Sequence, residues 1–159
     1  MRIIVIFILC IKFSFSAGYD FDEVRFIKAI DDKIYKSGHI DIDDFVVTVT
    51  YKTPSYKKIL KKENNVTIEG SSGNVYGLKG KALWYTDMYI DIMSRLGEYK
   101  SLKTNKDFYV DKEGEELRVT FLEDVGDVIK SALVFVKNQK VVSFKLYMHN
   151  GDTIEIIKK

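Results

Sequence analysis

Apolar residues recur at helical spacing in two segments of the chain and at alternate positions in most of the rest. The first segment is residues 20–38, which opens with acidic residues and closes on Gly38. Its apolar residues lie three or four positions apart: Phe21, Val24, Ile27, Ile30 and Ile34. This spacing predicts an amphipathic helix, capped at its start by Asp20 or Asp22 and ended by Gly38.

The second helical pattern covers residues 81–96 and is apolar around much of its circumference. One stripe contains Trp84, Met88, Ile92 and Leu96, and it is widened by Leu83, Tyr85, Tyr89 and Met93. Gly97 is expected to end this helix. A helix of this kind needs apolar neighbours on more than one side.

The remaining segments alternate apolar and polar residues, as strands do. Residues 45–52 predict a long strand that ends at Pro54, and residues 55–70 predict two short strands joined by a turn at 63–65. The glycine-rich stretch 70–80 is expected to be a loop. From residue 106 onward the chain predicts a meander of four or five strands, and its Asn150-Gly151 pair suits a tight type I′ turn.

This order of elements predicts an α+β fold. We expect a curled antiparallel β-sheet, a half-barrel, with the helices covering its concave face. One face of so long a sheet has to be covered, and the two predicted helices are the elements available for it.

The N-terminus has the form of a secretory signal peptide, because Arg2 precedes an apolar run from Ile3 to Ile11 and small residues follow. We expect residues 1–16 to be removed, leaving residues 17–159 as a single exported domain. That domain has 25 − 2 = 23 basic and 23 acidic residues and no cysteine. A balanced charge gives no reason to expect nucleic acid as a partner.

No pattern in the sequence points to catalysis, a metal or a cofactor. The two histidines, His39 and His149, lie beside predicted turns, without cysteine or glutamate at metal-ligand spacing. Acidic clusters occur at 41–44, 113–116 and 122–127, where solvated surface is the ordinary interpretation. We therefore predict no catalytic residue, no metal site and no cofactor.

The apolar residues of the second helix and of the strands leave two interpretations open. They form either a closed core or the lining of a cavity that accepts acyl chains, for which flexible methionines and large aromatics are suited. In the second case the lipid-binding residues would be Phe45, Val47, Val49, Trp84, Met88, Ile92, Val119, Phe121, Phe144 and Leu146.

The second half of the chain resembles the periplasmic outer-membrane lipoprotein carrier family (LolA/LolB-like). The resemblance covers residues 82–157 and is one of pattern: a helix "ALWYTDMYIDIMSRLGEY", then "LRVTFL", "ALVFV", "VVSFKLYM" and a last strand "NGDTIEI". It implies a non-catalytic periplasmic carrier that binds lipoprotein acyl chains, or another lipid, for transfer towards the outer membrane. An inner-membrane release complex would be a partner. No individual functional residue is transferred from the family.

Two other functions compete with the carrier. One is an exported adaptor or interaction domain with a closed core and no ligand. The other is an enzyme using the carboxylates of 41–44 or 113–116, although the sequence offers it no nucleophile, metal site or base.

Overall fold

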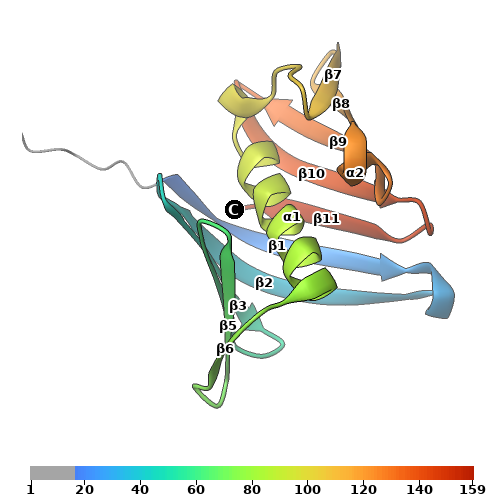
Figure 1. The fold of residues 1–159 in the computed structure, drawn as a ribbon. Helices are drawn as coiled ribbons and strands as arrows, with labels where there is room; N and C mark the ends of the chain where they lie inside the picture. The colour runs from blue at the N-terminus through green and yellow to red at the C-terminus, as the bar shows by residue number, and fades with distance from the viewer. Residues whose placement is uncertain (1–16) are drawn as a thin grey trace, which may run out of the picture.

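The computed structural model describes residues 17–159, which form one antiparallel sheet of eleven strands with two helices, an α+β fold (Figure 1). The signal peptide expected at residues 1–16 lies outside the described residues. The helices are α1 (Gly80–Leu96) and the short α2 (Glu123–Gly126), and two 3-10 turns are η1 (Lys28–Ile30) and η2 (Tyr99–Ser101). The strands are β1 (Ala17–Ile27), β2 (Asp32–Ile42), β3 (Val46–Thr53), β4 (Lys57–Lys62), β5 (Asn65–Gly70), β6 (Val75–Gly77), β7 (Phe108–Glu113), β8 (Glu116–Phe121), β9 (Ile129–Lys137), β10 (Lys140–Met148) and β11 (Thr153–Lys158).

The first and last strands meet in the middle of the sheet. The strand order is β6-β5-β4-β3-β2-β1-β11-β10-β9-β8-β7, and Phe21 of β1 lies opposite Lys158 of β11. Because β6 and β7 are opposite edges, the chain between them has to cross the sheet, and α1 makes this crossing over one face (Figure 1). We call this the helix-bearing face. The sheet is open and not strongly curled, which corrects the half-barrel expected from the sequence.

The helix predicted over residues 20–38 is wrong, because this segment forms the hairpin β1–β2. The chain reverses at Asp31, whose φ of 51° is left-handed. Tyr19, Phe21 and Glu23 are all buried on the helix-bearing face, so the true period is two. Glu23 and Arg25 interrupt the apolar alternation on that face, and the remaining apolar residues happen to match a helical spacing.

The other main elements are confirmed. The predicted helix 81–96 is α1, the strand ending at Pro54 is β3, the short strands are β4 and β5, and the meander is β7 to β11. The stretch 70–80, expected to be a loop, also contains the edge strand β6. The second helix on this face is α2, which the sequence did not predict.

The two turns that flank β10 differ in backbone conformation. At the β10–β11 connection only Gly151 has positive φ, 88°, and its amide donates to the Met148 carbonyl. This differs from a type I′ turn, which needs positive φ at both central residues. Asn138 and Gln139, between β9 and β10, have φ of 50° and 58° and form such a pair.

The core lies between the helix-bearing face and α1. Each of the central strands contributes fully buried residues, and α1 adds its own: Phe21, Ile40, Val49, Val119, Ala132, Val134, Phe144, Leu146, Ile156, Ile90, Met93 and Leu96. Within residues 17–159, no helix is both long and apolar enough to cross a membrane.

Gly38, expected to end a helix, instead lies in β2 at a point where no side chain fits. A Cβ there would be 2.5 Å from the Thr50 carbonyl oxygen and 2.8 Å from the Phe21 ring. We expect Gly38→Ala to lower the free energy of unfolding by about 1 to 3 kcal/mol, the range seen for overpacked cores. Urea denaturation measures this, with Gly70→Ala of β5 as the matched control, because nothing lies within 4 Å of a Cβ at Gly70. Equal losses in both variants would contradict the packing at Gly38.

Candidate functional site

A groove of about 260 Å³ lies between α1 and the segment that joins β8 to β9. Its apolar lining comes from α1, β7, β8 and α2, and consists of Trp84, Met88, Ile92, Leu96, Phe108, Phe121, Leu122 and Val125. Trp84 and Leu122 remain 40% and 42% exposed, so the groove is open to solvent. An apolar ligand can therefore enter it without unfolding the core.

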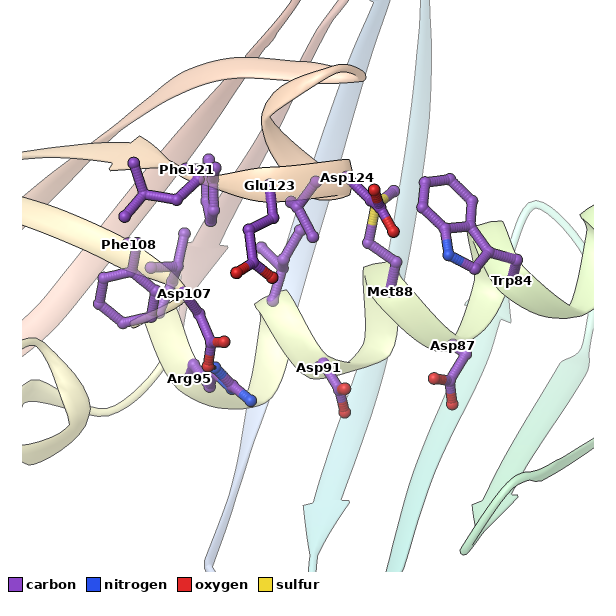
Figure 2. A pocket seen from close by; sticks show the side chains of 14 residues that line it. Trp84, Asp87, Met88, Asp91, Arg95, Asp107, Phe108, Phe121, Glu123 and Asp124 are labelled. Atoms are coloured by element: carbon purple, nitrogen blue, oxygen red, sulfur yellow. Dashed lines mark hydrogen bonds and ion pairs between the residues drawn. The ribbon is translucent and has the colours of Figure 1, made fainter. Parts of the chain in front are cut away.

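The positions of these side chains follow from the local structure. Met88, Ile92 and Leu96 recur every four residues of α1, which places them on one side of the helix. Phe108 and Phe121 lie opposite each other in the β7–β8 pair, with ring centroids 6.2 Å apart and edge-to-face geometry. Figure 2 shows Trp84 and Met88 on the side of α1 that faces Asp124.

The rim of the groove is acidic. Five carboxylates line it: Asp87, Asp91, Asp107, Glu123 and Asp124. Lys61 of β4 lies 2.7 Å from Asp87 and 2.6 Å from Asp91, and Arg95 of α1 pairs with Asp107. The Arg95 hydrogen bond holds the pKa of the Asp107 carboxyl below its usual value. Glu123 and Asp124 have no ion-pair partner among residues 17–159, and they project from α2 toward α1 (Figure 2).

A second polar cluster lies beneath α1, on the side of the helix away from the groove. Its centre is Glu23 of β1, the one charged side chain of residues 17–159 that is fully buried. The hydroxyls of Tyr51 and Tyr89 donate to its carboxylate at 2.8 and 2.6 Å. Arg25 donates to it through Nε, and Lys36 lies 3.4 Å away. The cluster thereby joins three neighbouring strands to α1.

The surroundings of Glu23 stabilise its charged form. Burial alone would raise the pKa of this carboxyl, but Arg25, the Tyr89 hydroxyl and Lys36 together hold the pKa below its ordinary value. The Arg25 guanidinium also lies 5.1 Å from the centroid of the Tyr89 ring, as in a cation–π contact. Glu23 is therefore an ionised structural group, held by three hydrogen-bond donors from Tyr51, Tyr89 and Arg25.

The C-terminal end of α1 is held to the sheet by further contacts. The Tyr19 hydroxyl donates to the Met93 carbonyl at 2.8 Å, and Lys158 Nζ donates to the Gly97 carbonyl at 2.7 Å. A Cβ at Gly97 would lie 2.5 Å from the Tyr19 ring, so a glycine is required there for close packing. Gly97 does end the helix, as predicted, although its φ of −70° is right-handed.

The structure separates the ten residues predicted to bind lipid into three groups. Trp84, Met88, Ile92 and Phe121 lie together in the groove. Val49, Val119, Phe144 and Leu146 are buried in the core, and Val47 is half-buried against it. Phe45 precedes β3 and is 77% exposed, away from the groove. These six therefore do not line the groove, and the observed cavity is smaller and more peripheral than the sequence indicated.

The sequence analysis did not identify the groove residues that lie just before β7 and just after β8. Asp107 lies just before β7, and Glu123, Asp124 and Val125 belong to α2, within the cluster 122–127 interpreted as solvated surface. The signal that could have identified them is the pair Leu122 and Val125, two apolar residues flanking adjacent acids in a short turn.

The histidines have local partners. His39 lies between Asp20 and Asp41, with nitrogen–oxygen distances of 3.0 and 3.1 Å, and His149 Nε2 is 2.9 Å from the Gly126 carbonyl oxygen. Within the part of the chain that the structure describes, no group of three or more His, Cys, Asp or Glu residues is arranged to hold a metal ion.

No protein-family model matches the sequence, and no curated protein matches it. Several solved structures do match. A LolA superfamily protein from Nitrosomonas europaea is 10% identical with a TM-score of 0.42, and the match covers 91% of this chain and 84% of that one. A DUF1329 family protein from Desulfovibrio piger is 7% identical with a TM-score of 0.44, covering 93% and 85% of the two chains.

A domain from Vibrio parahaemolyticus, described as an outer membrane lipoprotein-sorting protein, is 6% identical with a TM-score of 0.43 and covers 89% of this chain and 82% of its own. Each of the three matches covers about nine-tenths of this chain, with a TM-score below 0.5. At these identities and TM-scores the likeness is one of general fold.

Replacing the buried carboxylate is expected to remove a pH-dependent part of the stability. Because the folded-state pKa of Glu23 is lowered, its contribution is present above the ordinary pKa of about 4.3 and is lost as the pH falls through the folded-state value. At pH 7, Glu23→Gln should cost about 3 kcal/mol, the low end for breaking a buried ion pair, because Arg25 and Lys36 stay partly exposed.

Urea denaturation at several pH values between 7 and 2 measures both effects. The control is Glu155→Gln of β11, whose carboxylate is 35% exposed and 3.9 Å from Lys145. The Glu23 variant should show a flatter decline in stability below pH 4 than the unmodified protein. An unchanged slope would mean that Glu23 is not ionised in the fold.

Proposed function

We propose that this protein is a non-catalytic carrier that holds an acyl chain in the groove between α1 and α2. The observation that carries the proposal is the groove itself, which combines an apolar lining with two exposed apolar side chains, Trp84 and Leu122. Lipid and small-molecule sites are lined mainly by apolar side chains, which make up eight of the fourteen lining residues here. In keeping with the resemblance, the cargo would be a lipoprotein acyl chain, carried through the periplasm towards the outer membrane.

The size of the groove limits what it holds in this conformation. Its volume of about 260 Å³ lies just below the ~300 to 1,000 Å³ usual for ligand pockets. It therefore suits part of a single alkyl chain, and a larger acylated cargo requires α1 and α2 to move apart. Met88, which lines the groove from α1, has the flexible side chain needed to repack around such a chain.

The alternative is an exported adaptor with no ligand. It is favoured by the complete burial of Val119, Phe144 and Leu146, because these residues show that the centre of the sheet is closed core. In that case the groove would be a surface depression of no function. Binding of an apolar probe, and its dependence on groove residues, separates the two functions.

The test fills the groove with a bulky side chain. Val125→Trp, on α2, should weaken binding of the fluorescent apolar probe N-phenyl-1-naphthylamine by about tenfold or more, because the larger side chain takes up space that the probe needs in a site this small. The control is Val75→Trp in β6, where Val75 is 63% exposed and outside the groove. Circular dichroism would verify that both variants are folded. Equal binding by both variants, or no probe binding by the unmodified protein, would favour the adaptor.

A further inference from the structure

The acidic rim gives the groove a charge preference that an acyl-binding site does not need. The five carboxylates are faced by two cations, Lys61 and Arg95, so the rim has an excess of 5 − 2 = 3 negative charges. Residues 17–159 as a whole are neutral, with 23 basic and 23 acidic residues. The negative field at the groove is therefore local.

Two of the three uncompensated charges lie on the α2 side of the groove, at Glu123 and Asp124. Asp87 and Asp91 share Lys61, and Asp107 has Arg95, so these three carboxylates together keep one net negative charge. Glu123 and Asp124 are exposed, project toward α1 and have no ion-pair partner within the described residues (Figure 2). Asp124 faces Met88 and Trp84, which places a free carboxylate directly beside the apolar lining.

We infer that the groove selects a cationic amphiphile, an alkyl chain whose polar end carries an ammonium or guanidinium group. The chain would lie against Met88, Ile92 and Phe121, and the positive group would reach Glu123 and Asp124. Charge complementarity carries this choice, because an anionic end group would meet the same carboxylates with repulsion. The inference rests on the proposed function and adds the charge of the cargo to it.

For lipoprotein cargo, the inference means that the acylated end of the polypeptide would carry a lysine, an arginine or a free amine near the lipid. A carboxylate at that position would be disfavoured. Both effects are electrostatic between exposed groups, so they weaken as ionic strength rises.

The experiment compares three probes with the same alkyl chain, all below their micellar concentrations: dodecyltrimethylammonium, dodecyl maltoside and dodecyl sulfate. Each displaces N-phenyl-1-naphthylamine from the protein. The cationic probe should bind about fivefold more tightly than the neutral one, the size expected of one exposed ion pair, and the anionic probe more weakly. The difference should shrink in 500 mM salt.

Two double variants, each of which removes two negative charges, test where the preference arises. Glu123→Gln with Asp124→Asn should remove it while retaining binding of dodecyl maltoside. Glu115→Gln with Glu116→Gln, at the β7–β8 turn and outside the groove lining, should leave it unchanged. Equal binding of the three probes, or a preference that survives the first variant, would overturn the inference and leave the carrier proposal standing. Failure of all three probes to bind would overturn both.

Discussion

The buried carboxylate of Glu23 is the interaction on which the arrangement of α1 depends. An ionised group with no exposed surface is costly unless charges and hydrogen bonds compensate it, and four side chains do so here: Arg25, Lys36, Tyr51 and Tyr89. Three of them come from the sheet and one from the helix. Because directional hydrogen bonds are satisfied in few arrangements, the cluster fixes where α1 crosses β1, β2 and β3, which apolar packing alone would leave less well defined.

The same cluster explains why the β1–β2 hairpin could not be predicted. Strands are recognised by alternation, and β1 places Glu23 and Arg25 on the face that otherwise carries Tyr19 and Phe21. The polar interruption removes the period of two from the sequence. Its partners on β2, β3 and α1 are distant in sequence, so nothing local shows that these charges are neutralised inside the fold. By contrast, β8 to β11 bury only apolar residues on this face, and their alternation predicted them correctly.

The candidate site was predictable from α1 and from Phe121 of β8, but not from α2. Trp84, Met88 and Ile92 follow a helical stripe, which a single element reveals. The opposite wall is made by α2, a four-residue helix in which apolar and acidic residues are adjacent, and so short an element has no periodicity to detect. Its position depends on the turn after β8, where Leu122 is hydrogen-bonded to the Asp107 carbonyl. Which acidic residues face the groove is therefore a property of the tertiary structure.

The Glu23 cluster and the groove lie on different sides of α1, and the two sides differ in how firmly they are packed. One side is held by the Glu23 cluster and, at its end, by Tyr19 and Lys158. The other borders the groove, where Trp84 and Leu122 keep much of their surface in water. The exposed Trp84 contributes less to stability than the buried Ile92 and Leu96 beside it, because burial is what makes an apolar residue stabilising. Under the carrier proposal, ligand would enter and leave along this side without disturbing the core, and movement of the short α2 would be the smaller structural change that admits a longer chain.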